Sequence, residues 1–224
     1  MAMFPLGSVL FPGAVLPLHV FEPRYRQMVQ DCLASDEPEF GVALIDRGSE
    51  VGGGDIRSMV GTVARIMQVA EMDDGRYALI AVGVRRIRVD YWLPDDPYPR
   101  AEVSDWPDSE DYGSEIEVAL ATSLGRVRRV NALATELGEV SADATSDISD
   151  DPLLGSYHLS VLAPVGPADQ QRLLAASGPS ERLRLLTEAI DDVEAGLRFR
   201  LACDSSGGLE GDTDGEMPRD IDEP

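Results

Sequence analysis

The chain contains 224 residues, with 41 Asp and Glu against 19 Lys and Arg, and its formal net charge is −22. All the basic residues are arginine, which excludes a Schiff-base lysine, a lysine-dependent phosphate loop and a Ser-Lys catalytic dyad. The acidic charge also argues against sequence-independent binding to nucleic acid or to anionic membranes, because both need clustered basic side chains.

The first half of the chain is predicted to be mainly β-structure. Its first apolar stretch, residues 14–21, contains Pro17 and is therefore expected at a sheet edge. Glu22-Pro23 opens a short helix, since proline is favoured in the first helical turn. Asp73-Asp74-Gly75 is a hairpin signal between two strands. The other strands are expected at Phe40–Ile45, Val60–Met72, Arg76–Val84, 86–91 and Arg100–Trp106, and a loop is expected at Gly48–Asp55.

Helices are predicted in the second half. Apolar residues recur at three- and four-residue steps between residues 116 and 137, and again between 183 and 197. Pro152–Leu162 and Pro167–Ala176 are predicted as two shorter helices, and Ser177-Gly178-Pro179 separates the second of them from the final helix. Each helix has one apolar stripe, so the helices are expected to pack together as a bundle.

Composition divides the chain into three parts. Residues 1–110 are expected to form the β subdomain and residues 111–203 the helical subdomain, because the acidic stretch 104–115 lies between them. Residues 204–224 contain eight acids and one arginine and are expected to be a disordered acidic tail. No apolar run approaches the roughly 18 residues of a membrane span, and no basic residue precedes Arg24, so a soluble, cytoplasmic protein is expected.

The sequence offers little catalytic or metal-binding chemistry. His19 lies in an apolar strand, and Ser156 and His158 are predicted to point to different faces of one helix. Cys32 and Cys203 are far apart and form no metal-binding pair. No nucleotide loop, nucleophile elbow or zinc-protease motif occurs. We therefore expect no catalytic residue, no metal site and no cofactor.

The N-terminal segment carries the most specific pattern, in the strings Phe4-Pro5-Leu6-Gly7, Val9-Leu10-Phe11-Pro12-Gly13 and Phe21-Glu22-Pro23-Arg24-Tyr25. Here the chain resembles the N-terminal, substrate-binding domain of Lon proteases, and it looks most like the stand-alone bacterial proteins made of that domain. The similarity continues through Phe40-Gly41-Val42 and Gly83-Val84-Arg85-Arg86, and it covers roughly residues 3–202.

The resemblance implies an α+β fold, with an N-terminal PUA-like six-stranded β-barrel and one short helix, followed by a helical bundle. In Lon proteases an ATPase module and a Ser-Lys protease domain follow this region, and the lack of lysine excludes both here. The resemblance therefore implies a non-catalytic module that binds unfolded or extended polypeptide. Such a module would recognise degradation substrates, act as an adaptor, or work with a protease or chaperone.

The same segment supplies the candidate peptide-binding residues. We expect its aromatic and proline side chains to line a groove beside an irregular sheet edge, where an extended apolar peptide could add. These residues are Phe4, Phe11, Pro12, Phe21 and Tyr25. The structural alternative is that the aromatic residues belong to the core and the prolines protect edge strands from pairing.

Two other classes of function stay open. A hydrolase with an unrecognised carboxylate or serine site would need a pocket in which titratable groups converge. A small-ligand or nucleic-acid binder is the third class, because PUA-like barrels include such proteins. Nucleic-acid binding would need a larger basic patch than Arg86 and Arg88, which strand alternation places on one face.

Overall fold

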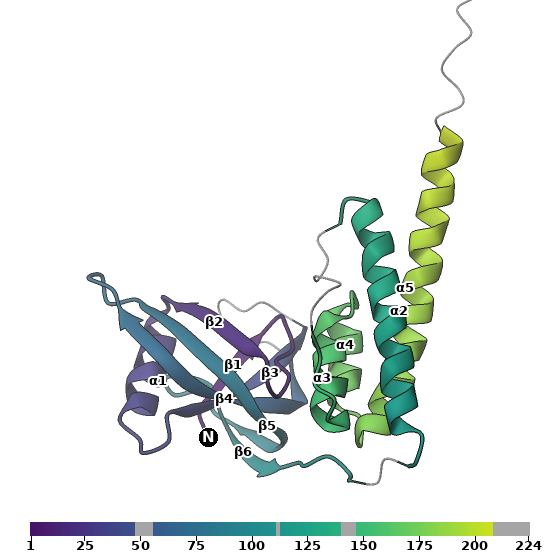
Figure 1. Cartoon of the computed structure of the whole chain (residues 1–224). Coiled ribbons are helices and arrows are strands. Elements are labelled where there is room, and N and C mark those ends of the chain that lie inside the picture. The colour runs from purple at the N-terminus through teal and green to yellow at the C-terminus, as the bar shows by residue number, and fades with distance from the viewer. Residues whose placement is uncertain (48–55, 111–112, 140–146, 208–224) are drawn as a thin grey trace, which may run out of the picture.

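The computed structural model describes residues 1–47, 56–110, 113–139 and 147–207, with side chains described up to Cys203. Within these residues the strands and one helix come first, and four helices follow (Figure 1). The strands are β1 (Met3–Leu6), β2 (Val15–Val20), β3 (Glu39–Arg47), β4 (Ile56–Glu71), β5 (Tyr77–Leu93) and β6 (Arg100–Asp105). The helices are α1 (Pro23–Leu33), α2 (Ile116–Glu136), α3 (Pro152–Leu162), α4 (Pro167–Leu174) and α5 (Pro179–Gly207).

The strands form one mixed six-stranded sheet, so the expected α+β class is confirmed. Five strands follow the order β1-β3-β4-β5-β2, and β6 pairs with the second half of the long strand β5. β1 runs parallel to β3, and the other pairs are antiparallel. A single bridge between Ala2 and Arg100 joins the β1 end to β6. The described pairings do not close the sheet, so the six-stranded β-barrel that the resemblance implies is not confirmed.

Two strands differ from the sequence prediction. Met3–Leu6 forms β1, which was not predicted, because four residues paired in parallel show no alternation of apolar and polar side chains. Residues 76–84 and 86–91 were expected as separate strands but belong to the single strand β5. In the structure the strand continues through Arg85 and Arg86, and the Arg86 side chain is buried.

Four of the five described helices begin at a proline, as the sequence pattern indicated. Proline is suited to this position because the first helical N–H groups have no partner within the helix. In α3 the start is fixed by a second interaction as well, because the Asp151 carboxylate caps the helix by accepting a hydrogen bond of 2.9 Å from the Leu154 N–H. The Ser177-Gly178-Pro179 break between α4 and α5 is likewise confirmed.

The four later helices, α2 to α5, stand against one end of the sheet, and α1 lies near the other (Figure 1). α3 and α4 lie next to the sheet, and the long helices α2 and α5 run side by side beyond them. One hydrophobic core lies between the sheet and α1, and a second lies among the four later helices. We call the junction between the sheet and the α3–α4 pair the seam.

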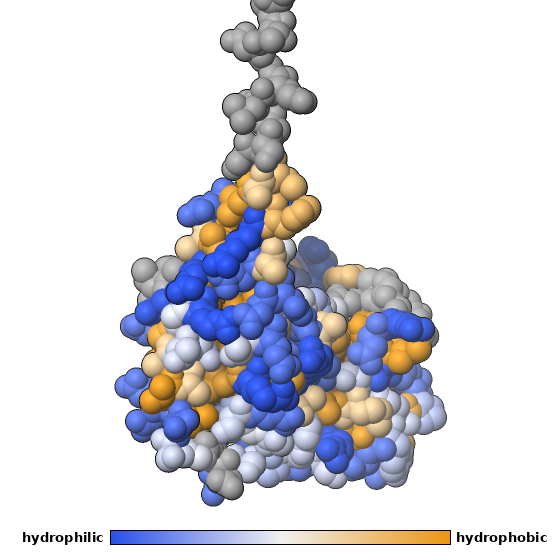
Figure 2. Space-filling view, turned by 90° about the vertical axis from the view of Figure 1, so that its right-hand side faces the viewer, coloured by the Kyte–Doolittle hydropathy of each residue, from blue (hydrophilic) through white to orange (hydrophobic). Residues whose placement is uncertain are grey.

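The last turns of α5 project beyond the rest of the bundle (Figure 1). The exposed surface there is rich in hydrophobic residues (Figure 2), and Phe199 in this part of α5 is 70% exposed. α5 continues to Gly207, past residue 204, where the tail was expected to begin. The expected tail beyond it and the expected loop at Gly48–Asp55 lie outside the described residues. Among the described helices, none is both long and apolar enough to cross a membrane.

Candidate functional site

The loop between β1 and β2 reaches the seam because two small contacts fix it on the sheet. The Thr62 hydroxyl donates a hydrogen bond of 2.6 Å to the Leu10 carbonyl, and the Gly13 N–H donates one of 2.8 Å to the Gly83 carbonyl. A Cβ atom at Gly83 would collide with the Phe11 carbonyl oxygen, so this close approach requires glycine. The loop thereby delivers the Phe11 ring into the helical core, where its centroid lies 6.1 Å from that of Tyr157.

An open cleft of about 340 Å³ lies along the seam beside this loop, and we call it the seam cleft. Its apolar walls come from the loop, from β5, from the segment after β6 and from α3. The apolar and aromatic lining residues are Pro12, Val84, Trp106, Pro107, Leu153, Leu154 and Tyr157. The charged lining residues are Arg85, Arg86, Asp105 and Asp108. A cavity with apolar walls and a few placed charges has the usual composition of a ligand site.

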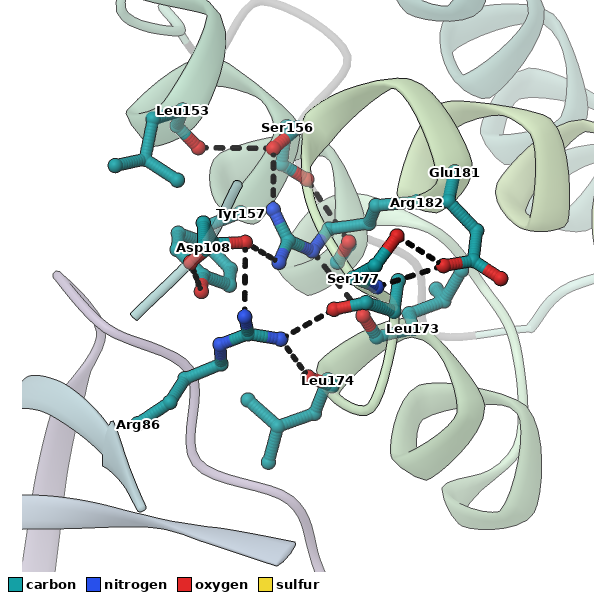
Figure 3. Close-up of polar contacts among 12 residues, drawn as sticks. Arg86, Asp108, Leu153, Ser156, Tyr157, Leu173, Leu174, Ser177, Glu181 and Arg182 are labelled. Carbon is teal, nitrogen blue, oxygen red and sulfur yellow. Dashed lines mark hydrogen bonds and ion pairs between the residues drawn. The ribbon is translucent and has the colours of Figure 1, made fainter. Parts of the chain in front are cut away.

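A buried charge cluster forms the floor of the seam cleft (Figure 3). It consists of Asp108, from the segment after β6, with Arg86 from β5 and Arg182 from α5. One Asp108 carboxylate oxygen accepts a hydrogen bond from Arg182 Nη2 and lies 3.2 Å from Arg86 Nη2. The other oxygen accepts a hydrogen bond from the Tyr157 hydroxyl. Both arginine side chains are at most 1% exposed, so these charges are almost completely removed from water.

The carbonyl groups at and just after the end of α4 partly offset the extra positive charge. Arg86 Nη1 donates to the carbonyls of Leu174, at 2.7 Å, and Ala176. Arg182 Nε donates to the Leu173 carbonyl at 3.1 Å. The last carbonyls of a helix carry partial negative charge and lack partners in the helix, so they stabilise nearby cations. The Arg86 hydrogen bonds join β5 to the end of α4 across the seam, and the Arg182 hydrogen bond joins α5 to α4.

Burial changes the acid–base properties of this cluster. Loss of hydration lowers the pKa of the Arg86 guanidinium from its ordinary value, although Asp108 opposes the effect. Burial also raises the pKa of the Tyr157 hydroxyl, and its hydrogen bond to Asp108 acts in the same direction. Tyr157 therefore stays a neutral donor at physiological pH. Arg86 Nε is buried and has no hydrogen-bond partner in the described part of the chain.

Further charged side chains surround the mouth of the cleft. The Arg86 and Arg88 guanidiniums lie 4.5 and 4.6 Å from the centre of the Trp106 ring, which places both on the face that strand alternation predicted. Arg85 binds Glu39 at 2.7 Å and Asp105 at 3.0 Å. Glu39 is also bound by Arg65. The mouth thus combines an aromatic surface with arginines that are only partly neutralised.

The five candidate residues from the sequence do not form one exposed surface. Phe4 and Tyr25 are stacked at 4.2 Å within the core between the sheet and α1, and Phe11 is buried in the other core. Phe21 is 56% exposed, beside a small pocket that His19 also lines. Only Pro12 lines the seam cleft. The expectation of a shared aromatic groove is thereby corrected, because three of the four aromatic rings are buried in the hydrophobic cores.

Sequence reasoning did not identify the residues of the charge cluster. Asp108 lies in the acidic stretch 104–115, which was interpreted as the boundary between the two subdomains, and Arg182 was one of several arginines in a helical pattern. The available signal was Trp106-Pro107 within that stretch, since a large aromatic residue is unusual in a solvated linker. His158 serves the fold, because its Nδ1 accepts a hydrogen bond of 3.1 Å from the Ser149 N–H. The described residues contain no group of three or more His, Cys, Asp or Glu that could hold a metal ion.

Comparisons with known proteins agree on one family. A model of the "ATP-dependent protease La (LON) substrate-binding domain" matches residues 1–192. Lon protease 2 of Sorangium cellulosum is 30% identical over 186 residues, which cover 80% of this chain and 23% of that protein. Lon protease 2 of Myxococcus xanthus is 28% identical over 204 residues, covering 89% of this chain and 24% of that protein. The chain thus spans about a quarter of the length of these curated relatives.

Solved structures show the same similarity. The crystal structure of a Lon N-terminal domain protein from Xanthomonas campestris is 32% identical, with a TM-score of 0.62, and the match covers 84% of this chain and 96% of that one. The N-terminal domain of a Mycobacterium avium complex Lon protease gives a TM-score of 0.61 at 19% identity, over 85% of this chain and 97% of that one, which shows a shared fold.

Proposed function

The chain belongs to the LON substrate-binding domain family, and from that premise we propose that it binds extended, apolar polypeptide segments in the seam cleft. The family supports the binding of protein substrates. The choice of site rests on one observation, which is that the cleft combines seven apolar or aromatic lining residues with an open mouth. Leu154, one of the lining residues, is 42% exposed, so its side chain is available to a bound segment.

We propose that this module is not an enzyme. The similarity to Lon proteases covers their substrate-binding part and not their ATPase or protease parts. The chain also has no lysine for a Ser-Lys dyad or a nucleotide loop. A cytoplasmic location, an adaptor role beside a protease or chaperone, and the division at residues 110 and 203 belong to the same proposal, as does the PUA-like character of the sheet.

The candidate residues from the sequence take different roles in this proposal. Pro12 contacts the bound segment in the seam cleft, and Phe21 offers a second, smaller contact point beside the turn between β4 and β5. Phe4, Phe11 and Tyr25 act indirectly, by holding the loop and α1 in place. The cleft is small, so affinity should be about micromolar or weaker.

The test is fluorescence anisotropy with a labelled, permanently unfolded protein. Leu154→Ser should weaken binding about tenfold, because it removes one apolar contact surface from the cleft. Val118→Ser is the matched control, since Val118 is a 69% exposed apolar residue on α2, outside the seam cleft. Equal effects of the two substitutions, or equal binding of a folded protein, would contradict the proposal.

A further inference from the structure

We propose that the seam cleft selects the C-terminal end of a polypeptide, with the last side chain against the apolar walls and the terminal carboxylate facing the arginines of the floor and mouth. This inference rests on the proposed function and specifies which part of a bound chain the site takes. Two features of the cleft support it: the local balance of charge and an unsatisfied donor.

The local charge is opposite to that of the whole protein. Four cationic side chains belong to the cleft, its floor and its mouth, namely Arg85, Arg86, Arg88 and Arg182. Three carboxylates accompany them, namely Glu39, Asp105 and Asp108. The site therefore has a small positive excess within a chain of net charge −22. An anionic group is attracted here, although the rest of the surface repels it.

The arginines also have unused hydrogen-bonding capacity. Arg86 is 3% exposed, yet its Nε has no acceptor in the described part of the chain. A buried donor without a partner is rare in native proteins, and a ligand oxygen is one way to satisfy it. Arg88 makes a ring contact with Trp106 and has no carboxylate partner among the described residues. Arg88 is exposed and can donate directly to a carboxylate beside Trp106, whereas Arg86 Nε has almost no accessible surface and can donate only if a bound chain end displaces its neighbours.

The size of the cleft favours a chain end over an internal acidic residue. A cavity of about 340 Å³ holds one or two side chains, so only a short part of a bound polypeptide enters the cleft itself. In a C-terminal residue the apolar side chain and the carboxylate leave the same Cα, so both can enter together. With an internal Asp, the backbone on both sides of the residue would have to fit into the cleft. Asp105 at the mouth is 69% exposed and would repel a carboxylate, but Arg85 binds and partly neutralises it.

The experiment compares three peptides of one sequence, each ending in leucine. One has a free C-terminal carboxylate, one has a C-terminal amide, and one is an amide with Asp beside the leucine. Trp92→Phe leaves Trp106 as the single tryptophan, so its fluorescence reports binding at the cleft. The free acid should bind about fivefold to tenfold more tightly than the plain amide, as expected for one charge-assisted hydrogen bond.

Two arginine variants localise the effect. Arg88→Gln should bring the ratio of acid to amide affinity towards one, whereas Arg128→Gln should leave it unchanged. Arg128 is an exposed arginine on α2 that lies outside the cleft, so it controls for net charge. Equal effects of the two variants would overturn the assignment to the cleft.

The outcomes separate this inference from the proposed function. If the acid and the amide bind equally, the terminal carboxylate is not recognised, while the binding of apolar segments stands. If the Asp-containing amide binds as tightly as the free acid, selection of the chain end is refuted. If neither leucine peptide binds but the unfolded protein does, the inference also fails. If nothing binds, the proposed function itself is wrong.

Discussion

Asp108→Asn should destabilise the protein strongly, although it changes only one atom group. The substitution removes the one carboxylate of the buried charge cluster and leaves the guanidiniums of Arg86 and Arg182 facing each other at 1% and 0% exposure. Breaking a buried ion pair by removing one partner costs about 3–5 kcal/mol. The hydrogen bond from Tyr157 survives to a neutral acceptor in weakened form, which adds up to about 1 kcal/mol. The expected loss of about 4 kcal/mol is a large fraction of the ~5–15 kcal/mol that stabilises a typical domain.

Equilibrium unfolding in urea, followed by circular dichroism and by tryptophan fluorescence, measures this loss. Asp105→Asn is the matched control, because Asp105 lies three residues earlier and also pairs with an arginine, but is 69% exposed. Its removal should cost between about 0 and 1 kcal/mol. If Asp108→Asn costs less than about 1 kcal/mol, or no more than Asp105→Asn, then Asp108 is not needed to neutralise the two buried arginines, and the reasoning is wrong.

Three further predictions concern other positions. Gly83→Ala should lower the free energy of unfolding by about 1–3 kcal/mol, because its Cβ would displace the β1–β2 loop; an unchanged melting temperature would show that the loop moves freely. Burial opposes ionisation of Glu39, but hydrogen bonds from its two arginines hold its pKa below the ordinary 4.5. Ionised Glu39 therefore stabilises the fold above that pH, and this stabilisation is lost as the pH falls through the lowered pKa. Glu39→Gln should therefore show a smaller fall in melting temperature in acid than the unchanged protein. An equal fall in both proteins would contradict this. Burial raises the pKa of Cys32 to about 11. A disulfide reagent at neutral pH should therefore modify the exposed Cys203 in a fast phase and the buried Cys32 only when the protein unfolds. Two equal fast phases would show that Cys32 is not buried.

The sequence predicted helices better than strands, for a physical reason. Prolines marked the starts of four of the five described helices, because a local steric property decides where a helix can begin. β1 and the continuity of β5 depend on partners far along the chain, and no local pattern reports them. Pro17 did identify β2 as an edge strand, since a missing N–H is a local property too.

The candidate site was less predictable than the fold. The aromatic residues of the N-terminal segment stood out in the sequence, but the same apolarity that made them candidates also buried Phe4, Phe11 and Tyr25. Asp108 could not be distinguished from its acidic neighbours, because burial of one carboxylate depends on arginines from β5 and α5. Only the folded arrangement shows which acid neutralises which base.

The contacts across the seam set the order in which this chain can finish folding. The Phe11 ring packs against Tyr157, and Arg86 binds carbonyls at residues 174 and 176. Such distant partners raise the contact order, which slows folding and couples the two halves into one cooperative transition. During synthesis the sheet leaves the ribosome with Phe11 and the Arg86 guanidinium still hydrated. Both reach their final surroundings only after α4 has been translated, so the sheet cannot bury these two side chains until the helices have been synthesised.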